Sequence, residues 1–130
     1  MRIEAYFQQI GDAIDNCPVA HSSSVDYDKR STYVGFVRGE VDFVDGTMLH
    51  LREFVNLQKP FKRLAYAYQY MTNDHQLIFR YDNTGHHKKL NLPTYPHHKH
   101  DQSEDNVVAS PAPDLVTVLG EIEALVQLPN

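Results

Sequence analysis

The sequence contains a single cysteine, Cys17, and no long run of apolar residues. One cysteine cannot form an intramolecular disulfide, which is typical of proteins from a reducing compartment. No apolar segment approaches the roughly 20 residues that a transmembrane helix requires. The N-terminal segment MRIEAYFQQI mixes charged and apolar residues as an amphipathic helix does, which argues against a signal peptide. These absences favour a cytoplasmic protein without a membrane span.

Other common sequence signatures are missing as well. There is no internal repeat, no glycine-rich phosphate-binding loop and no cysteine-based zinc pattern. The net charge of −5 also excludes a broadly basic surface, so attraction to nucleic acid has to come from a local patch. A length of 130 residues predicts one domain, 1–130, which can bury a core without disulfides or metal. We expect no cofactor.

Apolar residues recur at helical spacing near both ends of the chain. The first stripe predicts an N-terminal helix that ends before Pro18 and consists of Ile3, Phe7, Ile10 and Ile14. The second stripe predicts a C-terminal helix, capped by Ser110 or Asp114. Its apolar residues are Leu115, Val118, Leu119, Ile122 and Val126.

Between these helices apolar and polar residues alternate, which is typical of strands with one buried face. The alternation predicts about five strands, near 19–28, 33–44, 48–55, 63–72 and 76–82. The predicted fold is therefore α+β, an antiparallel sheet of about five strands with the N- and C-terminal helices packed on one face. Segment 83–110 has no clear period and is predicted to be a long loop that docks through a few apolar residues.

Two hairpins fix the predicted register. A three-residue loop at Asp45-Gly46 keeps Leu49 and Leu51 on the apolar face, whereas a two-residue loop sets them opposite Asp42 and Glu40. Gly46 should then have a positive φ. Asn73-Asp74 predicts a two-residue turn that pairs Tyr68 with Phe79 and Tyr66 with Tyr81.

The same alternation assigns side chains to two faces. The tyrosines of the fourth strand and Phe79 fall on the apolar face and are predicted core residues. The other face is predicted to carry charged and polar residues: Arg38, Glu40, Asp42, His50, Arg52, Arg80 and Asp82. Glu53 has the apolar parity, so it lies either at the sheet margin or, if buried without a partner, becomes a candidate acid.

The segment from His86 to His100 is a local basic island. It holds five of the eight histidines and three lysines, and it has no acidic residue. Histidine transfers protons near neutral pH, and arginine and lysine stabilise developing negative charge, so this composition is compatible with metal-independent RNA cleavage. The candidate catalytic residues are Arg80, His86, His87, His97 and His98. The candidate RNA-binding residues are Lys88, Lys89, Lys99 and His100.

Three other interpretations stay open. The same histidines are able to ligate zinc or nickel, although adjacent histidines on an extended chain point in opposite directions. In a second interpretation, some or all of these histidines are solvated loop side chains, and Arg80 forms a surface ion pair with Asp82. The segment also suits a noncatalytic interaction domain in which the loop docks a partner.

The segments YFQQI, GFVRGEVDFVDGTMLHLREFV, YAYQYM, LIFRYDNTGHH and YPHHKH follow each other in an order that resembles TumE-type toxins. The most specific part is RYDNTGHH followed by PHHKH. The resemblance implies a small cytosolic bacterial toxin that a cognate DNA-binding antitoxin neutralises, and a ribonuclease activity acting on RNA. It provides no catalytic residues to transfer. The predicted architecture is also similar to RelE-like toxins, and self-association is left open.

Overall fold

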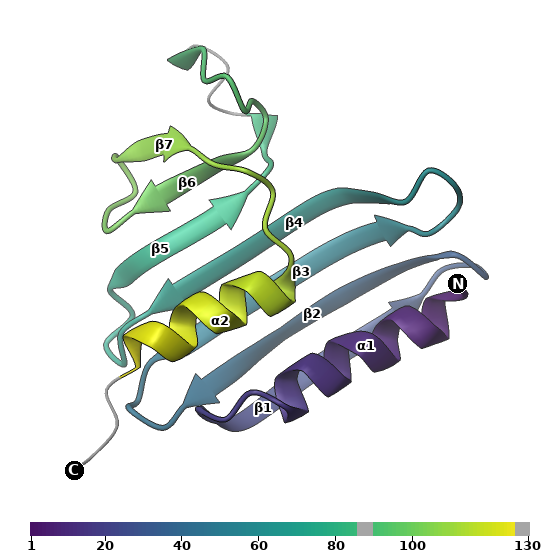
Figure 1. Ribbon diagram of the computed structural model, residues 1–130, viewed down its shortest axis with the longest axis horizontal. Coiled ribbons are helices and arrows are strands. Elements are labelled where there is room, and N and C mark those ends of the chain that lie inside the picture. The colour runs from purple at the N-terminus through teal and green to yellow at the C-terminus, as the bar shows by residue number, and fades with distance from the viewer. Residues whose placement is uncertain (86–89, 127–130) are drawn as a thin grey trace.

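The computed structural model describes residues 1–85 and 90–126 and contains two helices and seven strands (Figure 1). The elements in chain order are α1 (Ile3–Asp15), β1 (Ala20–Lys29), β2 (Val34–Phe43), β3 (Met48–Asn56), β4 (Lys62–Met71), β5 (Leu77–Asp82), β6 (His98–Asp101), β7 (Val107–Ala109) and α2 (Leu115–Leu125).

The strands form one antiparallel sheet in the order β1 to β7, so each strand pairs with its neighbour in the sequence. Both helices lie on the same face of this sheet, as Figure 1 shows. The predicted α+β class and helix placement are confirmed, but the sheet has seven strands rather than about five. The two additional strands lie in the segment predicted to be a loop. Both strands are short. The buried residues of β6 are His98 and His100, so apolar and polar residues do not alternate along this strand and hydropathy does not reveal it.

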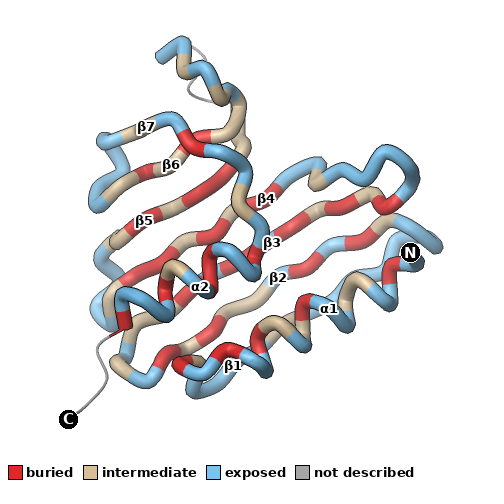
Figure 2. The backbone as a smooth tube through the Cα atoms, viewed as in Figure 1, coloured by how far each residue is buried: buried red, intermediate tan, exposed pale blue. Residues whose placement is uncertain are grey.

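The core lies between the sheet and the two helices. Buried residues alternate along the central strands, as Figure 2 shows. Phe79 is 2% exposed and Tyr68 is fully buried, so the predicted aromatic core is confirmed. The helices contribute Ile3, Ile10 and Ile14 from α1, and Leu115, Val118, Leu119 and Ile122 from α2.

The helix ends agree with the sequence prediction. The α1 helix ends at Asp15, shortly before Pro18. Asp114 caps α2, because its carboxylate accepts a hydrogen bond from the backbone N–H of Thr117 at 2.9 Å. Neither of these helices, which are the ones in the described part of the chain, is long and apolar enough to cross a membrane.

The β2–β3 hairpin has the predicted three-residue loop. The backbone N–H of Phe43 donates to the carbonyl of Thr47 at 2.9 Å, and Gly46 has φ 88°. Leu49 pairs with Val41, so the apolar side chains of both strands share one face. Burial has selected the register, because a slip of one residue exchanges the faces.

The predicted two-residue turn at Asn73-Asp74 is wrong. The backbone N–H of Thr72 donates to the carbonyl of Gln76 at 2.9 Å, and His75 adopts a left-handed φ of 67°, so three residues form the loop. A bulge between Tyr70 and Met71 shifts the pairing by one further residue, so Tyr68 pairs with Tyr81, and Tyr70 with Phe79. The Thr72 hydroxyl stabilises the longer loop by accepting from the N–H of Gln76 at 3.0 Å. The register moves by two residues, which leaves the faces unchanged.

Candidate functional site

Strand pairing places polar side chains in two rows across the face that the helices leave uncovered. In the first row, each residue is the Cα partner of the next: Asp26, Arg38, Arg52, Ala67, Asp82 and His98. In the second row, the residues are Ser24, Glu40, His50, Gln69, Arg80 and His100. We call the surface formed by these rows the helix-free face.

A cavity of about 820 Å³ lies on the helix-free face. Its lining includes the cationic side chains Arg38, Arg52 and Arg80, together with His50. The small Ala67 lies between Arg52 and Asp82 in the first row and also lines the cavity. The long arginine side chains surround a short one, and this arrangement leaves room for a ligand.

Arg80 is held in place by four side chains. Its Nε donates to Asp82 Oδ2 at 2.9 Å, and its Nη1 donates to Glu104 Oε1 at 2.9 Å and to Gln69 Oε1 at 3.3 Å. Its Nη2 lies 3.0 Å from His100 Nε2. The planar guanidinium suits such a fixed set of acceptors, and its side chain remains 24% exposed toward the cavity.

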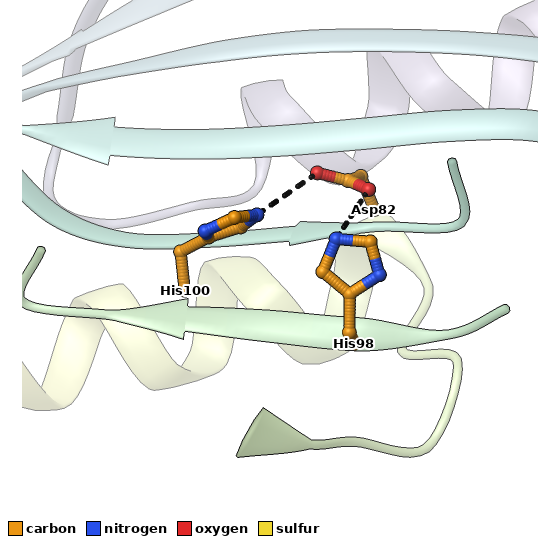
Figure 3. A group of neighbouring side chains, drawn as sticks. All are labelled: Asp82, His98 and His100. Atoms are coloured by element: carbon orange, nitrogen blue, oxygen red, sulfur yellow. Dashed lines mark ion pairs between the residues drawn. The ribbon is translucent and has the colours of Figure 1, made fainter. Parts of the chain in front are cut away.

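The acidic partner Asp82 lies at the centre of a buried cluster. His98 and His100 project from β6 toward it, and Figure 3 shows both imidazoles facing the carboxylate. His98 Nε2 is 2.9 Å from Asp82 Oδ1, and His100 Nε2 is 3.8 Å from Oδ2. Burial alone would raise the pKa of Asp82, but the backbone N–H of Thr84, His98 and Arg80 together lower it below its ordinary value.

The hydrogen bonds assign the protons of the two histidines. Each Nδ1 faces a backbone carbonyl, that of Pro96 for His98 and that of Glu104 for His100, so each Nδ1 carries a proton. His100 Nε2 then accepts from Arg80, which makes this imidazole neutral. His98 Nε2 faces the carboxylate of Asp82 and lies 2.9 Å from its Oδ1.

The same three residues have the donor set of a metal site. One ligand atom from each of Asp82, His98 and His100 lies within 4.8 Å of the others. Histidine metal ligands commonly donate their other ring N–H to a backbone carbonyl, as both imidazoles do here. Arg80, however, places a cation at His100 Nε2 and Asp82 Oδ2, two of the atoms that would ligate the metal.

His50 faces the cavity more openly than the β6 histidines. Its side chain is 47% exposed and its Nε2 lies 3.4 Å from Glu40 Oε2. His98 and His100 are each 2% exposed and are not among the residues that line the cavity, whereas Arg80 and Asp82 are. A substrate in the cavity would therefore meet Arg80 and His50 before it met the buried imidazoles.

Two of the sequence-predicted site residues lie on the helix-covered side. His97 Nδ1 is 2.8 Å from the hydroxyl of Tyr66, and burial lowers the pKa of His97. Lys99 pairs with Glu121 of α2 at 3.3 Å, and its Nζ lies over the ring of Tyr81. Adjacent histidines thus point to opposite faces, as expected for a strand.

The structure brings Arg80, His98 and His100 together. His86, His87, Lys88 and Lys89 lie outside the described residues. Asp82 and His50 are absent from the sequence-predicted sites, although alternation assigned both to the polar face. The available sequence signal was that alternation places Asp82, His50 and Arg80 on the same face of the sheet.

Glu53 lies on the opposite face and is not at the sheet margin. It is 2% exposed, and both of its oxygens accept hydrogen bonds, one from Tyr6 of α1 and one from Tyr68 at 2.8 Å. Burial and then Glu53 itself raise the pKa of both tyrosines, so they remain donors. Arg63 donates to the Tyr68 hydroxyl at 3.0 Å and to the carbonyl of Pro113 before α2 at 2.6 Å. The network joins α1, the sheet and α2.

The fold and the helix-free face define a small α+β protein with an arginine–histidine–carboxylate cluster beside a polar cavity that three arginines and three carboxylates line. The family model described as Toxin TumE matches residues 10–126, and the chain therefore belongs to the TumE toxin family. Membership of a toxin family implies an antitoxin partner in general. No curated protein and no solved structure matches the chain significantly.

Proposed function

We propose that this toxin is a metal-independent ribonuclease that acts in the cytoplasm and cleaves RNA in the cavity of the helix-free face. The observation that carries the proposal is the convergence of Arg80 and His50 on one cavity, with Arg80 fixed from behind by buried groups. The family membership supports toxicity, and the chemistry of the cavity supports RNA as its target.

Cleavage of a phosphodiester requires a cation at the phosphorane and a group that moves protons. Arg80 supplies the cation, because a guanidinium binds phosphate oxygens through two parallel hydrogen bonds. His50 removes the proton of the 2′-hydroxyl, and Glu40 orients its imidazole. The 2′-oxygen forms a bond to phosphorus, and the 5′-oxygen leaves with a proton from water, while Arg80 keeps its contact with the phosphorane.

Asp82 and His100 act as positioning residues. They fix the guanidinium of Arg80 before substrate binds, which lowers the entropic part of the barrier. Loss of His100 should therefore lower the rate without changing its pH dependence, whereas loss of His50 should change both. A pH–rate profile separates the two roles.

The test begins with induced expression in bacteria with and without the neighbouring antitoxin gene. We expect growth arrest and RNA fragmentation only without the antitoxin. Arg80→Ala should reduce cleavage by about 10²- to 10³-fold, and His50→Ala by about 10²- to 10⁴-fold. Arg80→Lys retains the charge without the planar geometry and should also be impaired.

His21→Ala is the matched control, because His21 is exposed on β1 and is not among the residues that line the cavity. It should cleave as the wild type does. Normal growth without the antitoxin, together with intact RNA after incubation with purified protein, would refute the ribonuclease proposal. Full activity of Arg80→Ala and His50→Ala would refute this assignment of the site.

A metal-dependent enzyme is the second candidate, and the donor geometry of Asp82, His98 and His100 favours it. Metal would require the guanidinium of Arg80 to move away from His100 Nε2. Metal analysis of untagged protein and cleavage in the presence of a chelator decide between the candidates. The ribonuclease proposal expects cleavage to persist in chelator, and cleavage that needs added metal would favour the second.

We further propose that the antitoxin is a DNA-binding protein encoded beside the toxin gene. Toxin–antitoxin pairs of this kind form a complex, and co-expression followed by size-exclusion chromatography would detect it. The same experiment measures whether the toxin alone associates with itself. Free toxin that elutes unchanged in the presence of the neighbouring protein would contradict the pairing.

A further inference from the structure

The helix-free face carries two arginines directly opposite each other. Arg38 and Arg52 are Cα partners on β2 and β3, and both side chains are exposed. Like charges at directly opposed positions of an antiparallel pair are destabilising. Throughout residues 1–85 and 90–126, neither guanidinium forms an ion pair with a carboxylate. The pair therefore presents two cations to the cavity that it lines.

The acidic residues around the cavity are mostly engaged elsewhere. Glu40 lies 3.4 Å from His50, and both Asp82 and Glu104 bond to Arg80 at 2.9 Å. Their negative charges are offset locally. Asp26, the Cα partner of Arg38, also lines the cavity, so one further carboxylate lies beside the two positive charges of Arg38 and Arg52. The charge at this point of the face thus complements an anion, although the chain as a whole has a net charge of −5.

An aromatic pair lies one step further along the same two strands. Phe36 and Phe54 are Cα partners, and their rings stack with centroids 4.2 Å apart and an interplanar angle of 6°. Phe36 is 37% exposed, and the guanidinium of Arg30 lies 4.8 Å from its ring centroid. Exposed aromatic rings beside arginines bind single-stranded nucleic acids, because unpaired bases stack on them.

We propose that Arg38 and Arg52 bind one phosphate of a single-stranded RNA, and that one of its bases stacks on Phe36 in place of the exposed Arg30 guanidinium, with Phe54 supporting the ring from its other face. This inference rests on the proposed function and deepens it by naming unpaired RNA as the substrate. Arg52 and Arg80 lie two strands and two residues apart, about 12 Å between their Cα atoms, so the phosphate at Arg38 and Arg52 lies within one or two nucleotides of the one cleaved. The bases of a duplex are paired and do not reach the phenylalanines.

Binding is measured by fluorescence anisotropy with a labelled 2′-O-methyl oligoribonucleotide. This probe lacks the 2′-hydroxyl nucleophile, so its binding is independent of cleavage. Arg38→Ala and Arg52→Ala should each weaken binding about tenfold or more, the equivalent of one charge-assisted hydrogen bond. Loss of the phosphate contact should also reduce the slope of log K against log salt by about 0.7.

Lys29→Ala is the charge-matched control, because Lys29 pairs with Glu4 of α1 at 2.6 Å and lies on the helix-covered side. It should leave both affinity and salt slope unchanged. Phe36→Ala should weaken binding roughly 5- to 150-fold without changing the salt slope. Thermal melts test whether each variant is folded. If Arg52→Ala does not fold, Arg52→Gln removes the charge while keeping most of the side-chain volume.

Several outcomes would overturn the inference. One is that Arg52→Ala binds the probe as tightly as Lys29→Ala does. Another is that the wild type binds duplex RNA as tightly as the single-stranded probe. A third is that it binds a polyglutamate peptide as tightly as the single-stranded probe. The ribonuclease proposal fails separately. If the wild type binds the probe as described but leaves unmodified RNA intact, the subsite stands and the ribonuclease proposal is refuted. If the wild type cleaves RNA and Arg52→Ala binds the probe as tightly as the wild type, the ribonuclease proposal stands and the subsite is refuted.

Discussion

The buried Glu53 offers a quantitative test of what holds the two helices against the sheet. Glu53→Gln keeps the shape of the side chain and removes its charge. The amide oxygen should face Tyr68, whose hydroxyl already accepts a hydrogen bond from Arg63, and the amide NH₂ should donate to Tyr6. Both hydrogen bonds thus survive, but as bonds between neutral groups.

The expected cost follows from these two bonds. A hydrogen bond to a charged group contributes about 1.5–3 kcal/mol and a neutral one about 0.5–1.5 kcal/mol, so two conversions remove roughly 2–3 kcal/mol. Easier burial of the neutral amide offsets part of this, and we expect a net loss of about 1–3 kcal/mol in the free energy of unfolding. Glu53→Ala leaves two hydroxyls and Arg63 without the carboxylate, and should cost about 3–5 kcal/mol.

Urea denaturation followed by far-UV circular dichroism measures both values, with an unchanged m-value as the sign that the same surface unfolds. Glu40→Gln is the matched control, since Glu40 forms a half-exposed pair with His50, and its effect on stability should stay within about 0.5 kcal/mol. If Glu53→Gln is as stable as the wild type and Glu53→Ala loses less than about 2 kcal/mol, the network does not stabilise the fold.

Two further predictions concern the aromatic core. Phe79→Ala should lower the free energy of unfolding by about 3–5 kcal/mol, because Phe79 is 2% exposed among other rings, and a loss below about 1 kcal/mol in urea denaturation would contradict this. Burial raises the pKa of Tyr66 to about 12 from 10.0, so its stabilising contribution, roughly 2–3 kcal/mol, is fully present below pH 10 and is lost as the pH rises toward 12. Tyr66→Phe should flatten the decline in stability over this range, and an unchanged slope would contradict the assignment.

Strands β2 to β5 were predictable because their buried face is mostly apolar. Leu49 and Leu51 alternate with polar residues, and the faces they define are those of the structure. β6 was not predictable in this way, because its buried side chains are His98 and His100. Their burial depends on Asp82 and on backbone carbonyls, which are partners that hydropathy does not reveal.

The composition of the site was therefore more predictable than its assembly. Alternation placed Arg80 and Asp82 on one face, but the pairing of Arg80 with His100 requires β6. The side chains of His97 and Lys99 point to the opposite face of the sheet. There His97 contacts Tyr66, and Lys99 pairs with Glu121 of α2. The high density of histidines indicated the segment that contributes to the site. Only the strand geometry shows which of these side chains point to the helix-free face and which to the helix-covered face.

The partners of Arg80 differ in how readily a ligand replaces them. Asp82 is buried, and its Oδ1 accepts a hydrogen bond from the backbone N–H of Thr84 and lies 2.9 Å from His98 Nε2, so the contact of its Oδ2 with Arg80 Nε is fixed by the fold. Glu104 meets Nη1 at 2.9 Å from a side chain that is 56% exposed, and water solvates its carboxylate once it is released. A phosphate that approaches from the cavity therefore competes with Glu104 rather than with Asp82. The guanidinium retains its orientation during this exchange, which is the condition under which a charge prepared before binding stabilises a transition state.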